Sequence, residues 1–129
     1  MTSKLHVPGP VPNKKDNYAP RRGGKGKGLY IPSDIQRALN SIQLILQNKW
    51  QRQPPLTGAS VDFRFLLANV RHDLDGMGAT LQDCLVNAKV LAGDSVLHVR
   101  ENHYSFDLVP KHKVGVEITL IGEPIPEVA

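Results

Sequence analysis

Aspartates crowded into one stretch of this sequence are the side chains best suited to carry chemistry. They are Asp73, Asp75, Asp83 and Asp94, and Lys89 is the only basic residue among them. Asp73 and Asp75 are two residues apart, so in an extended segment both carboxylates face one side while Leu74 points to the core. Oxygen ligands with retained waters suit Mg²⁺ or Mn²⁺. The spacing therefore predicts a metal site at Asp73 and Asp75, which Asp94 would close from another direction.

The same aspartates also fit purely structural roles. Asp75 is a suitable N-cap for a following helix, and Asp94 beside Gly93 suits an Asx turn. Asp83 fits a solvated helix position. A D-x-D pattern is short and common, so the spacing alone leaves both interpretations open.

Other kinds of site have little support. The five histidines lack the spacing of a zinc site, and a single cysteine, Cys84, excludes a disulfide or a cysteine-built metal site within one chain. The simplest interpretation of Cys84 is a buried side chain that packs in the hydrophobic core. The glycine-rich run 23–28 lacks the spacing of a phosphate-binding P-loop.

Positive charge is concentrated at the beginning of the sequence. Residues 1–32 carry seven basic side chains and one acidic one, a net +6, whereas residues 33–129 carry nine basic and eleven acidic ones, a net −2. Residues 8–32 form a basic loop rich in Pro and Gly, which suits contact with nucleic-acid phosphates or, alternatively, a solvated surface. The predicted DNA contacts are Lys14, Lys15, Arg21, Arg22, Lys25, Lys27 and Arg71.

Hydrophobic periodicity predicts the elements that must position these side chains. Period-2 alternation or short apolar runs predict strands at 4–7, 59–67, 95–100 and 114–120, and a 3.6-residue period predicts helices at 33–50 and 76–90. The order of elements indicates one α+β (mixed α/β) domain over residues 1–129, a small mixed sheet with two helices. Residues 122–129 lack a pattern, so we expect a flexible tail.

The composition also bears on location. No apolar run approaches the roughly 18 residues of a membrane span, and residues 1–8 lack the apolar core of a signal peptide. We expect a cytoplasmic protein.

The aspartate stretch resembles the RusA family of Holliday junction resolvases. The residues that carry this resemblance are Asp73-Leu74-Asp75-Gly76, Leu81, Asp83, Leu85 and Gly93-Asp94-Ser95. Val7-Pro8-Gly9-Pro10-Val11-Pro12, with basic residues after it, is similar to the family's first strand and loop. The predicted strand at 114–120 is similar to the last strand of the family, so the resemblance covers about residues 4–121.

The resemblance implies a Mg²⁺-dependent endonuclease, with Mn²⁺ as a substitute, that nicks four-way DNA junctions as an intimate homodimer in recombination and repair. It places Asp73, Asp75 and Asp94 as metal-binding and catalytic residues, with Asp83 at a further acidic position, and it implies a bacterial or phage-encoded protein. A catalytic lysine of the family falls at Ala79, so either a cation such as Lys14, Lys15 or Arg71 takes its part or the metal alone suffices. The alternative is a branched-DNA-binding protein of the same fold with weak catalysis.

Overall fold

The computed structural model describes residues 2–13, 19–20, 29–30 and 33–126 of the chain. Its elements are, in chain order, β1 (Thr2–Pro8), β2 (Ala19–Pro20), β3 (Leu29–Tyr30), α1 (Ser33–Trp50), β4 (Leu56–Leu67), α2 (Leu74–Asn87), β5 (Val99–Leu108), a 3₁₀ turn (Lys111–Lys113) and β6 (Gly115–Pro124). The class is α+β, as the sequence predicts.

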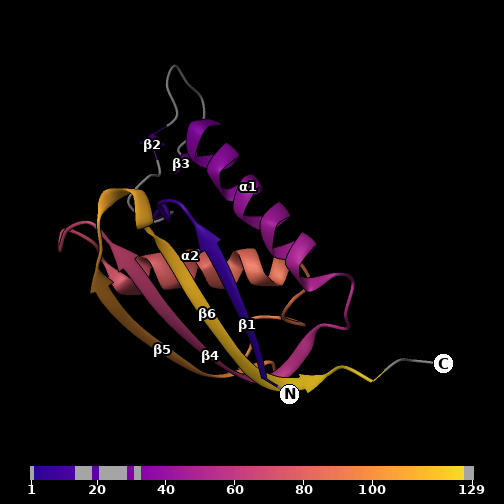
Figure 1. The fold of residues 1–129 in the computed structure, drawn as a ribbon. Helices are drawn as coiled ribbons and strands as arrows, with labels where there is room; N and C mark the ends of the chain where they lie inside the picture. The colour runs from indigo at the N-terminus through magenta and orange to yellow at the C-terminus, as the bar shows by residue number, and fades with distance from the viewer. Residues whose placement is uncertain (1, 14–18, 21–28, 31–32, 127–129) are drawn as a thin grey trace.

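Four strands form a mixed sheet in the order β1-β6-β4-β5 (Figure 1). β6 is antiparallel to both β1 and β4, whereas β5 is parallel to β4. A parallel neighbour needs a crossover connection, and α2 provides it between β4 and β5. β2 and β3 pair only with each other, within the segment predicted to be irregular.

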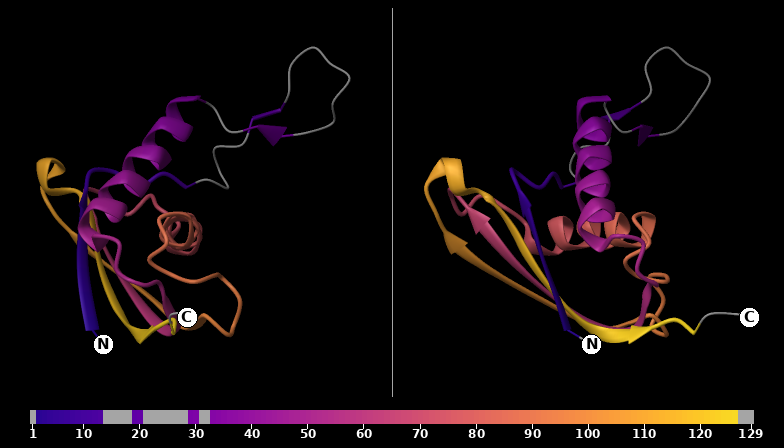
Figure 2. Two further views of the ribbon diagram at one scale, coloured as in Figure 1. Left: turned by 90° about the vertical axis from the view of Figure 1, so that its right-hand side faces the viewer. Right: turned by 45° about the vertical axis from the view of Figure 1, so that its right-hand side comes forward.

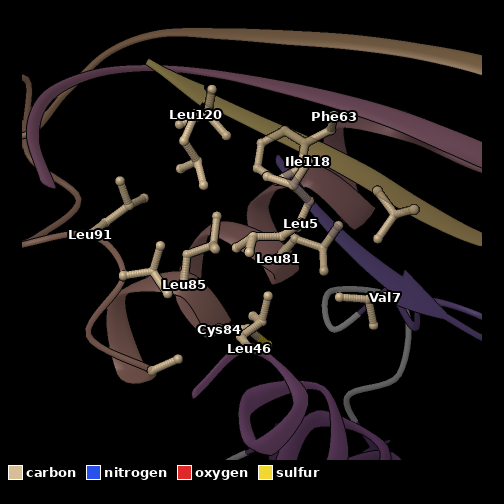
Figure 3. Packing of buried hydrophobic residues seen from close by; sticks show 14 of the residues in the cluster. Leu5, Val7, Leu46, Phe63, Leu81, Cys84, Leu85, Leu91, Ile118 and Leu120 are labelled. Carbon is tan, nitrogen blue, oxygen red and sulfur yellow. The ribbon is translucent and has the colours of Figure 1, made fainter. Parts of the chain in front are cut away.

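Both helices cover the same face of the sheet (Figure 2). Alternate residues of β4, Val61, Phe63 and Phe65, are fully buried on that face, while Asp62 and Arg64 between them are exposed. Figure 3 shows Phe63 and residues of β6 packing against Leu81 and Leu85 of α2. The buried side chains of the strands, which alternate along each strand, pack against the buried side chains of the helices, which recur at each helical turn. Together they form one core.

Helix α1 has the bounds that its periodicity predicts. Leu39, Ile42, Leu46 and Trp50 are buried at spacings of three or four residues. The helix ends where Trp50 and Gln53 exchange two hydrogen bonds, from Trp50 Nε1 to the Gln53 carbonyl oxygen (2.9 Å) and from Gln53 Nε2 to the Trp50 carbonyl oxygen (2.8 Å). These bonds fix the turn that leads into β4.

Helix α2 begins two residues earlier and ends three residues earlier than predicted. Its N-cap is Asp73, and Asp75 lies in its first turn, which corrects the assignment of Asp75 as the cap. Cys84 is buried in the core, as expected. After the helix, Lys89 adopts the left-handed conformation with φ 62°, a role that suits glycine better.

The strand predicted at 95–100 is wrong. Val96 and Leu97 lie in a turn, with 88% and 70% of their surface exposed, and β5 begins only at Val99. The predicted tail also begins too early, because β6 continues to Pro124 and the Ile125 amide donates to the Pro55 carbonyl oxygen at 2.9 Å. Residues 127–129 of that tail lie outside the described residues.

None of the helices in the described ranges is both long enough and apolar enough to cross a membrane.

Candidate functional site

The aspartate pair sits at the start of α2. Asp73 is extended (φ −100°, ψ 107°), and its carboxylate accepts a hydrogen bond from the Asp75 backbone amide at 3.1 Å. Asp75 is already helical, so the prediction that both residues lie in an extended segment is wrong for Asp75. Both carboxylates are nevertheless exposed, and Leu74 between them packs against the core as expected.

A residue of the basic loop, Asn13, packs against this same helical turn. Asn13 is the last described residue before Lys14, and its side chain fills the space beside Gly76. A Cβ placed on Gly76 would stand 2.6 Å from Asn13 Cγ, closer than real Cβ contacts. Glycine at this position therefore allows Asn13, a residue of the basic loop, to contact the residue that follows Asp75.

Tyr104 of β5 approaches the helix from the sheet. A Cβ on Gly78 would stand 2.7 Å from Tyr104 Cζ, so the ring lies directly on the helix backbone. The ring also stacks on Phe63, with centroids 5.7 Å apart and an interplanar angle of 30°. Burial raises the pKa of Tyr104, and the negative charge of Asp75 raises this pKa further. The phenol thus belongs to the surroundings of the aspartate pair.

Asp83 lies away from the pair along α2. It is exposed in the middle of the helix, and eight residues separate it from Asp75, about 12 Å along the axis. Asp83 and Asp75 therefore do not meet on one ion in this arrangement.

Asp94 lies at the opposite end of the crossover. The amide of Ala92, two residues earlier, donates to the carbonyl oxygen of Leu56, where β4 begins, whereas Asp73 follows Leu67, where β4 ends. Helix α2 alone spans about 21 Å between the two regions. Within the described residues, no three His, Cys, Asp or Glu side chains gather around a possible metal position. One chain brings together Asp73 and Asp75 but not Asp94.

The predicted DNA contacts divide into two groups. Arg71 is exposed in the loop before Asp73, where its amide donates to Asn69 Oδ1 at 2.9 Å. The others lie outside the described residues: Lys14, Lys15, Arg21, Arg22, Lys25 and Lys27. Ala79, where the family resemblance places a lysine, is exposed on α2 one turn after Asp75.

Two carboxylates of this kind provide oxygen ligands that fit Mg²⁺, and such an ion would neutralise their mutual repulsion. Asp73 Oδ1 already accepts one backbone hydrogen bond, which holds this carboxylate in place. The chemistry of the pair suits a hard cation whose remaining ligands are waters or substrate oxygens.

Sequence reasoning missed Asn13 and Tyr104. The alternation of Tyr104, Phe106 and Leu108 with polar residues was the available signal for Tyr104. Nothing local marks Asn13, because its contact with Gly76 joins residues far apart in the sequence.

The chain matches no family model, and no curated protein matches it.

Proposed function

We propose that this protein is a Mg²⁺-dependent, structure-selective endonuclease that resolves Holliday junctions by paired phosphodiester hydrolysis. One observation carries the proposal: the exposed pair Asp73 and Asp75 lies beside Asn13, a residue of the basic loop that directly precedes Lys14 in the sequence. Metal-assisted phosphodiester hydrolysis uses carboxylates that hold the metal and cations that bind the phosphate backbone. The resemblance to RusA resolvases supports the choice of branched DNA, and a cytoplasmic location in a bacterium or phage-infected cell belongs to the same proposal.

Each group has a distinct part in this proposal. Asp73 and Asp75 would hold Mg²⁺, which when bound activates water and stabilises the leaving oxygen. The cations of the basic loop bind phosphates without reading bases. Arg71, which precedes the pair, offers a planar guanidinium to a phosphate near the cleaved bond. Tyr104 keeps the first turn of α2 against the sheet and so fixes the direction of both carboxylates.

The proposed homodimer fits the edge of the sheet. β5 is an edge strand, and of its ten residues only Val99 is buried. Phe106 and Leu108 on this edge expose 44% and 59% of their surface. An edge of this length is a template for pairing with another strand, and two copies related by a two-fold axis pair antiparallel. We propose that β5 pairs with β5 of a second chain.

Such pairing bears on Asp94. Because the partner's β5 runs in the opposite direction, its beginning lies beside the end of the first chain's β5. Leu108 at that end pairs with Leu67, which leads into the loop before Asp73. The dimer would therefore bring Asp94 of the partner subunit to the end of the sheet that holds Asp73 and Asp75. Two such composite sites, related by the axis, would suit paired nicks in a symmetric junction.

A second candidate is a branched-DNA-binding protein without efficient catalysis. It is favoured by Ala79 in place of a lysine and by the separation of Asp94 from the pair within one chain. The deciding experiment measures nicking of a four-way junction with Mg²⁺, with its component duplex arms as the control. Nicking of the junction, without nicking of the duplex arms, supports the resolvase. Junction binding without nicking in Mg²⁺ or Mn²⁺ supports the binding protein and contradicts the endonuclease.

A further inference from the structure

A depression of mixed polar and apolar lining lies at the other end of α2, where the C-terminal ends of both helices meet the chain's last described residues. It has a volume of about 770 Å³, within the range of sites that enclose small molecules. Its lining includes Gln47 and Asn48 of α1, the turn around Gln53 and Pro54, and Pro126. Lys89 approaches it from the end of α2. The acid pair takes no part in this pocket.

The charge of the lining has one sign. Arg52 and Lys89 line the pocket, and none of its lining residues is acidic. Both cations are exposed, and neither forms an ion pair with any residue in the described ranges. Two uncompensated cations on one concave surface attract an anion, and Arg52 adds a planar fork that matches phosphate oxygens.

The backbone of the same pocket is unusual. Gln51, Arg52 and Lys89 have φ of 55°, 59° and 62°, and they are all the non-glycine residues with positive φ in the described part of the chain. A residue with a side chain is strained in this conformation. Glycine would adopt this conformation more easily but would carry no charge. Two of the three strained residues, Arg52 and Lys89, are thus the cations that line the pocket.

The remaining lining suits the base of a nucleotide. The side-chain amides of Gln47 and Asn48 can hydrogen-bond the edge of a base, and Gln53, whose Nε2 donates to the Trp50 carbonyl oxygen, can offer its Oε1 as an acceptor. The rings of Pro54 and Pro55 offer flat apolar surface. The Arg52 guanidinium can stack on a base face. Bases in a duplex hide their faces and pairing edges, whereas bases in a single strand expose both. The pocket chemistry therefore favours an unpaired strand.

We propose that this pocket binds a nucleotide of single-stranded nucleic acid, with Arg52 and Lys89 on the phosphate and the amides on the base. The inference does not depend on metal binding by Asp73 and Asp75, because it concerns the opposite end of α2.

The chain offers a local reporter for this site. Trp50 lines the pocket and is the only tryptophan of the protein. Titration of the metal-free protein with a short oligothymidylate should change the Trp50 fluorescence in a saturable way. Inorganic pyrophosphate, which carries phosphate without a base, should compete only weakly.

Variants then assign the signal to the pocket. Arg52→Asn and Lys89→Asn remove the charges but keep a residue that tolerates positive φ, so the fold should be retained. In the double variant the oligonucleotide should bind about tenfold more weakly, and the salt slope should fall by about 1.4, since each phosphate contact contributes about 0.7 for a single strand. The matched control is Lys49→Gln, which removes a cation of α1 that does not line the pocket. It should change the affinity and the salt slope less than the double variant does.

Three outcomes would overturn the proposal. The first is a Trp50 signal that does not respond to the oligonucleotide. The second is a double variant, folded by circular dichroism, that binds like the parent protein. The third is pyrophosphate binding as tight as that of the oligonucleotide, which would assign the pocket to a free phosphate compound.

Discussion

The side chain of Asn13 occupies the space in which a Cβ of residue 76 would stand, with Asn13 Cγ 2.6 Å from that position. Glycine inside a helix costs about 1 kcal/mol relative to alanine. Gly76 nevertheless belongs to the first turn of α2, one residue after Asp75. The close approach thus places one residue of the basic loop beside the aspartate pair, and the proposal that this pair acts together with the loop rests on this contact.

The aspartate pair should be essential for cleavage but not for binding. Asp73→Asn and Asp75→Asn keep shape and hydrogen-bonding capacity but remove the charge that holds Mg²⁺, so junction nicking should fall by several orders of magnitude. Junction affinity without metal should hold or rise, because a repulsion of roughly 1 kcal/mol per carboxylate is relieved. Asp62→Asn, on the exposed face of β4, is the control. Intact nicking in both Asn variants would refute the metal site.

The cap role of Asp73 can be separated from its chemical role. Asp73→Ala removes the acceptor of the Asp75 amide and should lower the free energy of unfolding by about 0.5–2 kcal/mol, whereas Asp73→Asn should leave it nearly unchanged. Urea unfolding of the two variants measures both values. An Asn variant that is stable but inactive would show that the carboxylate does more than cap the helix. Equal destabilisation by Asn and Ala would contradict the cap.

Salt dependence tests the basic loop. Replacement of Lys14, Lys15, Arg21 and Arg22 by Ala removes up to four phosphate contacts, so the slope of log K against log salt for junction DNA should flatten by about 3 to 4. The control replaces Arg37, Lys49, Lys111 and Lys113, exposed cations elsewhere on the fold. An unchanged slope in the loop variant would exclude the loop as the main DNA contact.

Titration of Tyr104 tests its nearness to Asp75. Burial and Asp75 raise the pKa of Tyr104 above 10.0, so Asp75→Asn should lower this pKa, although burial should keep it above 10.0. The neutral phenol stabilises the fold below pH 10, and that contribution is lost as the pH rises through the raised pKa. Ultraviolet absorbance of tyrosinate measures the titration, with Tyr104→Phe to assign it. Asp94→Asn should leave the curve unchanged, and equal shifts in both Asn variants would contradict the placement.

Assembly tests the edge of β5. At micromolar concentration the mass in solution should be near twice the 14.2 kDa of one chain. Phe106→Lys with Leu108→Lys places charges on this edge, which opposes strand pairing, and should yield monomers that no longer make paired nicks. Ile121→Lys, at another exposed apolar residue on β6, is the control. A parent protein that is monomeric both free and on junction DNA would contradict the paired-nick mechanism.

Core elements were predictable because burial leaves a strong periodic signal. The helix with Leu39, Leu46 and Trp50 and the strand with Phe63 have long, regular apolar patterns. β5 was missed because an edge strand needs little burial, and the short apolar run at Val96 and Leu97 gave a stronger local pattern than the strand itself.

The candidate site was predictable only where it is local in sequence. Asp73 and Asp75 are neighbours, so their spacing was informative. The position of Asp94 depends on the length of α2 and on the parallel direction of β5, neither of which is encoded near residue 94. The contacts of Gly76 and Gly78 likewise depend on which distant side chains fill the space beside them.

The last strand of the chain lies inside the sheet and not at its edge, since β6 separates β1 from β4. While the protein is being synthesised, β1 therefore cannot join the four-stranded sheet until β6 (Gly115–Pro124) has left the ribosome. Pairing across such a long sequence separation slows folding and leaves unpaired strand edges exposed meanwhile. Loss of β6 would separate β1 from β4 and so divide the sheet, whereas loss of an edge strand would only make the sheet narrower. Nascent chains that stop short of Gly115 lack β6, so we expect them to depend on chaperones or to be degraded.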